Sequence, residues 1–142
     1  MYFFTKFISP ILFLTFSLTV LGQTTSASKD PIDKQYESCI GTNQTTQGMI
    51  ECAQIAEKAW DGELNKNYKQ LMTLLAPDEK ELLKKAQISW LAYRDNENKF
   101  SGTMYYNMQG SMWLITAADR TRSIVKARAI ELKMYYEILK DK

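Results

Sequence analysis

The segment AWDGELNKNY, residues 59–68, lies inside a long run that has the apolar periodicity of one helix. Its composition is unusual for that setting. Glycine costs a helix interior about 1 kcal/mol relative to alanine, and Asp and Asn are mediocre helix formers. The combination of Trp60, Asp61, Gly62 and Asn65 therefore predicts that contacts with other parts of the chain, rather than helix propensity, selected these residues.

Apolar residues on both sides of this segment recur every three or four positions, which is the helical period. The stripes cover residues 49–75, 83–104 and 114–139. Pro77 interrupts after the first stripe, and the acidic residues that follow it suit a new helix start. Long helices with short connections pack as antiparallel neighbours. The sequence thus predicts an all-α fold: three long antiparallel helices in a bundle, with a short N-terminal helix around Ile32–Ile40.

The N-terminus has the features of a cleaved signal peptide over residues 1–22. Lys6 precedes an apolar run that is short for a membrane-spanning helix, and the run ends at Gly22. An uncleaved anchor is the alternative. Residues 23–34 are small and polar and predict a flexible leader, which leaves residues 35–142 as one domain. We expect a periplasmic or secreted protein with no stable membrane insertion after signal cleavage.

Charge and cysteine content exclude several classes of function. The chain has 18 basic and 16 acidic residues, and loss of Lys6 leaves it near neutral, so no basic face for nucleic acid is expected. Cys39 and Cys52 are the two cysteines, and in an exported chain they predict a disulfide. A zinc site needs more ligands than two cysteines, and the chain has no histidine. We expect neither a metal nor a cofactor.

Polar residues border the apolar stripe of each long helix. Asp61 and Asn65 share a face of the first helix, Gln87 and Arg94 flank Trp90 on the second, and Arg122 lies on the third. Partly buried charges need partners, and arginine can pair with a carboxylate or an amide. A linked network of these polar residues is one interpretation, with Gly62 allowing the close approach of another backbone or ring. A ligand or catalytic pocket is the other.

Signals for catalysis are weak. Asp61 with Glu63, and Asp95 with Glu97, are two residues apart on a helix, so neither pair converges on one point. The chain has no histidine, no Gly-rich phosphate loop and no G-x-S-x-G motif. We therefore expect a protein that is not an enzyme, and a hydrolase that uses Asp61 or Glu63 is the weakest alternative.

Several motifs in this order resemble a known family. Cys39 is followed by Gly48-Met49 and Cys52, then by WDGELNKNYKQL at 60–71, AQISWLAYRD at 86–95 and Thr121-Arg122. The pattern spans roughly residues 36–132 and is similar to the LprI-like lysozyme inhibitor family of bacteria. The resemblance implies an exported helical domain and, for the member that gives the family its name, inhibition of lysozyme.

The chain departs from that family at one place. Members commonly carry a further cysteine shortly after the Tyr-Arg-Asp motif, paired with a more distant one, whereas Asn98 occupies that region here. The second disulfide that the resemblance implies is therefore missing, which bears on the rigidity of residues 98–113.

Two functions compete. The first is an exported inhibitor that binds a lysozyme-type enzyme through the glycine-containing region 101–111, which we expect to be a softer connection. Tyr- and Ser-rich loops often form adaptable contact surfaces. The candidate contact residues are Lys99, Ser101, Tyr105, Tyr106 and Ser111. The second is a structural or interaction module of the cell envelope without inhibitory activity. For the region 101–111 itself, an ordinary helix–helix connection is the alternative.

Overall fold

The computed structural model describes residues 29–142, which form four α-helices and no strand. They are α1 (Pro31–Thr42), α2 (Thr46–Leu74), α3 (Pro77–Tyr106) and α4 (Met112–Lys140). The expected signal peptide, residues 1–22, lies outside the described residues, as does most of the expected leader. Residues 31–34, which the sequence assigned to the leader, already belong to α1. The all-α prediction is confirmed.

The turn between α1 and α2 is fixed by a glycine and a disulfide. The backbone N–H of Gly48 donates to the Thr45 hydroxyl at 3.0 Å, which caps α2. A Cβ at position 48 would lie 2.8 Å from Asn43 Cβ, so only glycine fits this turn without a shift. Cys39 and Cys52 form the predicted disulfide, with their Cα atoms 5.7 Å apart. The short helix is thereby fastened to α2.

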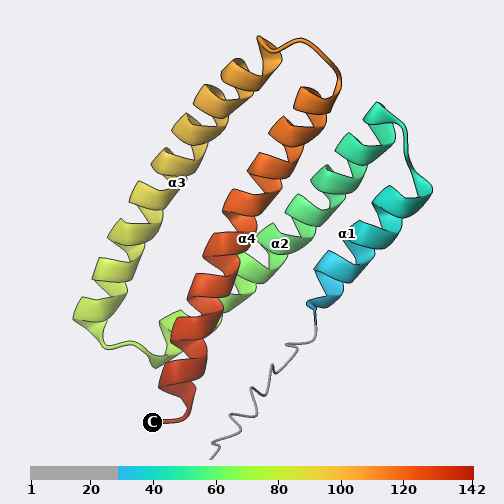
Figure 1. Ribbon diagram of the computed structural model, residues 1–142. Helices are drawn as coiled ribbons and strands as arrows, with labels where there is room; N and C mark the ends of the chain where they lie inside the picture. Colours follow the sequence, from blue (N-terminus) through green and yellow to red (C-terminus); the bar gives the residue numbers. More distant parts are fainter. Residues whose placement is uncertain (1–28) are drawn as a thin grey trace, which may run out of the picture.

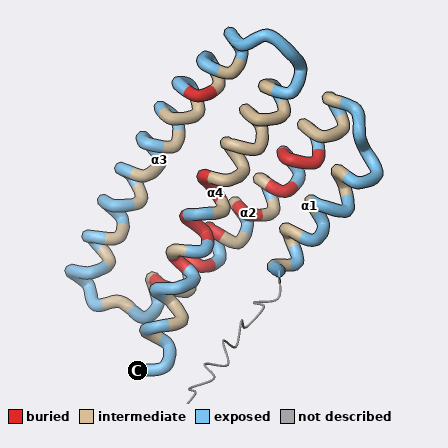
Figure 2. The backbone as a smooth tube through the Cα atoms, viewed as in Figure 1, coloured by how far each residue is buried: buried red, intermediate tan, exposed pale blue. Residues whose placement is uncertain are grey.

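The core lies between α2 and α4, which run parallel and side by side, with α3 returning between them in the chain (Figure 1). Their facing positions supply the buried apolar cluster, and the buried segments fall mainly on these two helices (Figure 2). Asn67 is also buried, and its amide donates to the carbonyl oxygen of Ala129 at 3.1 Å, which satisfies the polar group and locks the register. The cluster consists of Trp60, Leu64, Leu71, Val125, Ala129 and Leu132.

Helix α3 has fewer contacts with the other helices than is usual for a helix of a bundle. It packs on α4 and scarcely contacts α2, and Figure 1 shows it lying beside α4 on the side away from α1. Ser101 is its one buried residue, while Leu83 and Trp90 rest partly buried against the core. The helix continues to Tyr106, so the connection to α4 is confined to residues 107–111. The softer region expected at 101–111 is therefore helical over its first half.

The long helices do not have the character of membrane spans. Within residues 29–142 no helix combines the length and the apolar composition that crossing a bilayer would require.

Candidate functional site

A groove between α2 and α3 collects residues from both halves of the sequence pattern that resembles the LprI-like family. It is an open cavity of about 480 Å³. Asp61 and Asn65 lie on its α2 wall, and Gln87 and Trp90 on its α3 wall. We call it the α2–α3 groove; its lining is Asp61, Leu64, Asn65, Tyr68, Lys84, Gln87, Ile88, Trp90 and Leu91.

The α2 wall of the groove presents hydrogen-bond acceptors. The side-chain amide of Asn65 donates to the carboxylate Oδ2 of Asp61 at 3.0 Å and to its backbone oxygen at 2.8 Å. Both contacts require the Asn65 nitrogen to be the donor, so its carbonyl oxygen is left free. Asp61 and Asn65 therefore satisfy each other within the helix, one turn apart, and not through contacts with other parts of the chain.

The α3 wall presents donors. The Oε1 atom of Gln87 accepts from the guanidinium Nε of Arg128 on α4 at 3.0 Å. This fixes the orientation of the Gln87 amide and leaves its NH₂ group available. Arg128 is buried and also pairs with Glu131 at 2.7 Å, so it is itself held in place.

Arg94 does not bond to Asp61 or Asn65, contrary to the proposed network. It bonds to its exposed neighbour Asp95 at 2.7 Å, and its guanidinium carbon lies 5.5 Å from the centre of the Trp90 ring. Its charge also acts on Glu57, one turn before Asp61 on α2. Burial raises the pKa of Glu57; the positive charge of Arg94 lowers this pKa, and the negative charge of Asp61 raises it.

Arg122 is not in the groove. It lies on the opposite side of α4, against α1, where its guanidinium is 2.8 Å from Asp119 and 3.6 Å from Asp33. It also covers the ring of Tyr36, with 4.4 Å from the guanidinium carbon to the ring centre. Of the five residues of the predicted network, Asp61, Asn65 and Gln87 line the groove, Arg94 lies outside it, and Arg122 belongs to a separate site. We call that site the α1–α4 charge cluster; it consists of Asp33, Tyr36, Asp119, Arg122 and Lys126.

Hydrogen bonds and ion pairs tie this charge cluster together. Lys126 donates to Asp33 at 2.5 Å, and its ammonium lies 5.5 Å from the centre of the Trp60 ring. The Tyr36 hydroxyl donates to Asp119 at 2.9 Å. Burial raises the pKa of Tyr36, and the Asp119 carboxylate raises it further. The cluster's role is structural, because its opposite charges neutralise one another at a helix interface.

Four members of that cluster are not among the predicted site residues: Asp33, Tyr36, Asp119 and Lys126. A signal for two of them was present. Asp119 and Lys126 are three residues before and four after Arg122, so the helical period places all three on one face. The contribution of α1 had no such signal, because the contact of Asp33 and Tyr36 with α4 depends on how the short helix packs and not on spacing along the chain.

Gly62 also behaves differently from the prediction. It is exposed, and a Cβ built there would meet nothing within 4 Å. No backbone or ring approaches it, and nothing in the structure explains a glycine at this position.

The α3–α4 connection forms a protruding tip, which we define as residues 105–113. Figure 1 shows it at one end of the α3–α4 hairpin. The Tyr105 and Trp113 rings stack across it, with centres 5.9 Å apart and planes at 12°. Gly110 has φ of 107°, a conformation that favours glycine and permits the turn. The conformation of the tip thus depends on one stacked aromatic pair and on one glycine with a positive φ.

The five predicted contact residues differ in how far their side chains are exposed to solvent. Tyr106 is 78% exposed, and Lys99 and Ser111 are exposed as well. Tyr105 is half-buried in its stack with Trp113. Ser101 is buried and donates to the backbone oxygen of Glu97 at 2.7 Å, so it cannot reach a partner.

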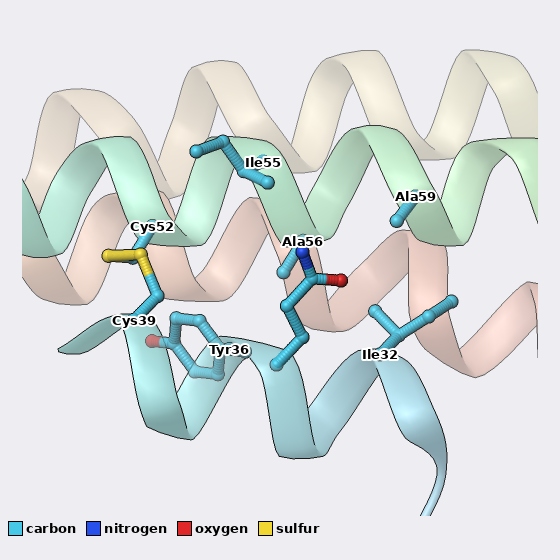
Figure 3. A pocket seen from close by; sticks show the side chains of 8 residues that line it. Ile32, Tyr36, Cys39, Cys52, Ile55, Ala56 and Ala59 are labelled. Carbon is cyan, nitrogen blue, oxygen red and sulfur yellow. A yellow bond between two sulfur atoms is a disulfide. The ribbon is translucent and has the colours of Figure 1, made fainter. Parts of the chain in front are cut away.

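A smaller cavity of about 80 Å³ lies beneath α1, beside the disulfide (Figure 3). Figure 3 shows Ile32 and Tyr36 on α1 and Ile55, Ala56 and Ala59 on α2 around it. Its lining is mainly apolar, and its size is that of a packing gap left where alanines on α2 face a short helix.

The described residues offer no catalytic constellation around Asp61 or Glu63. The Asp61 carboxylate accepts a hydrogen bond from Asn65, and Glu63 forms an ion pair with Lys66 at 3.1 Å along the helix. Within residues 29–142 no three His, Cys, Asp or Glu side chains are grouped to hold a metal ion.

Comparison with known proteins agrees with the sequence resemblance. The chain is 30% identical over 99 residues to an uncharacterized protein of Rhizobium meliloti (strain 1021), covering 61% of this chain and 70% of that protein. The fold is similar to the crystal structure of a putative uncharacterized protein from Burkholderia thailandensis, with a TM-score of 0.75 and 28% identity. That match covers 80% of this chain and 57% of the other, so this chain spans little more than half of that protein. The model of the family described as lysozyme inhibitor LprI matches residues 39–132, and the chain therefore belongs to this family.

Proposed function

We propose that this protein is an exported binding protein that blocks a muramidase-type glycosidase by placing the α3–α4 tip in the enzyme's sugar-binding cleft. Membership of the lysozyme inhibitor LprI family carries the proposal. Glycosidases of this type work with two carboxylates that flank the scissile bond in a cleft. A protein that occupies the cleft excludes the substrate without chemistry of its own.

The tip has a surface suited to such a cleft. No Asp, Glu, Lys or Arg occurs from Phe100 to Ala118, so an acidic cleft meets no like charge there. Tyr106 and Met112 are 78% and 64% exposed. Tyrosine supplies a large, rigid contact at low entropic cost, and tyrosines are frequent hot spots of interfaces. Lys99, about two turns before the end of α3, can approach the enzyme's carboxylates.

The first prediction is that Tyr106→Ala weakens inhibition at least tenfold, which is about 1.4 kcal/mol of binding free energy. Inhibition of several lysozyme classes should be titrated with wild type and variant. Leu82→Ala is the matched control, because Leu82 is 65% exposed near the opposite end of the same helix. Melting temperatures should be unchanged in both.

Two outcomes would contradict the proposal at different levels. Full inhibition by Tyr106→Ala would move the contact away from the tip. Absence of inhibition by the wild type, across all lysozyme classes tested, would favour an envelope interaction module over an inhibitor.

A further inference from the structure

We propose that the α2–α3 groove is a binding site for a neutral saccharide of one or two rings. This site is separate from the tip and goes beyond the inhibitory function. The groove has the dimensions of a small-molecule site, since ligand pockets are typically about 300–1,000 Å³ and this one is about 480 Å³.

The two walls carry complementary hydrogen-bonding groups. On the α2 wall, the second carboxylate oxygen of Asp61 and the carbonyl oxygen of Asn65 are acceptors without a partner among residues 29–142. On the α3 wall, the amide NH₂ of Gln87 is a donor whose orientation Arg128 fixes. A sugar hydroxyl both donates and accepts, so a ring between the walls can satisfy both sides at once.

The apolar part of the lining suits the carbon face of a sugar ring. Trp90, Leu64 and Leu91 supply that surface, and Tyr68 adds a ring with a hydroxyl that has no partner within the described residues. Small-molecule sites in proteins commonly have this composition, a mainly apolar lining with a few oriented polar groups.

The charges argue against other occupants. The lining contains one acidic residue, Asp61, and one basic residue, Lys84, whose formal charges cancel, so neither an anion nor a cation is favoured by the net charge of the lining. The apolar face of an amphipathic helix would leave the oxygens of Asp61 and Asn65 and the NH₂ group of Gln87 desolvated and unpaired, which is unfavourable. A neutral polyhydroxyl ligand avoids both penalties.

The test is a fluorescence titration with three neutral disaccharides: diacetylchitobiose, cellobiose and maltose. It is best made in a Trp113→Phe background, because Trp60 is buried and Trp90 then remains as the reporter in the groove. We expect saturable binding of at least one of them. The double variant Asp61→Ala/Asn65→Ala should bind that sugar at least tenfold more weakly, since both acceptors of the α2 wall are gone.

Gln54→Ala/Lys58→Ala is the matched control, with the same residue spacing on an exposed part of the same helix. It should bind as wild type does. Isothermal titration of the protein with intact tryptophans provides a second readout. No saturable binding of any of the three sugars at millimolar concentration would overturn the proposal. Equal binding by the groove variant and the wild type would overturn it as well. The assay contains no lysozyme, so its failure is distinct from failure of the inhibitory function.

Discussion

At the scale of single residues, the two arginines that the sequence grouped together have different environments. The side chain of Arg122 is 11% exposed and contacts the carboxylates of Asp33 and Asp119, and that of Asp33 is 13% exposed. The side chain of Arg94 is 27% exposed, and its partner Asp95 is 66% exposed. Removing one partner of a buried ion pair leaves an uncompensated charge, whereas exposed pairs contribute little.

We therefore predict that Arg122→Ala lowers the free energy of unfolding by about 3 kcal/mol. Arg94→Ala should lower it by at most about 1 kcal/mol. Urea denaturation of both variants at neutral pH measures the difference. Equal midpoints for the two variants would show that the α1–α4 charge cluster does not stabilise the fold.

At the scale of elements, α1 depends on contacts made at its C-terminal end and along one face. It has no buried residue of its own. The disulfide holds its C-terminal end to α2, and the charge cluster holds its middle to α4. A helix of 12 residues is marginal in isolation, so tertiary contacts must supply its stability.

Replacing Cys39 and Cys52 together by alanine should lower the free energy of unfolding by about 3 kcal/mol, the value for closing a short loop in the chain-entropy model. Alanine avoids placing a hydroxyl at position 52, which is 2% exposed. Reduction of the wild type should shift the denaturation midpoint by a similar amount. An unchanged midpoint in both experiments would mean that α1 is held by the charge cluster alone.

At the scale of the whole molecule, stability is unevenly distributed among the helices. The α2–α4 pair contains the apolar core, while α3 contributes one buried residue and contacts α4 along one side. Large apolar side chains of α3 are correspondingly exposed, among them Leu82, Ile88 and Phe100. Local openings occur most readily where few apolar contacts are buried.

Amide hydrogen exchange should therefore show α3 at least tenfold less protected than the central turns of α2 and α4, which is about 1.4 kcal/mol of opening free energy. Exchange followed by mass spectrometry on the native protein resolves the helices. Equal protection of α3 and of residues 60–71 would indicate a single cooperative unit instead.

The helical class, the disulfide and the family could be predicted from the amino-acid sequence, because each depends on local information: a 3.6-residue apolar period, a cysteine pair in a chain with export features, and contiguous motifs. The sequence also placed Asp61, Asn65 and Gln87 beside the core. Which polar groups meet could not be predicted, because it depends on how the helices pack. Arg122 turns toward α1 and Arg94 toward Asp95, because the rotation of each helix about its axis is set by packing with its neighbours. The same packing buries Ser101 and exposes Tyr106, five residues along the same helix, a difference that depends on where α4 lies.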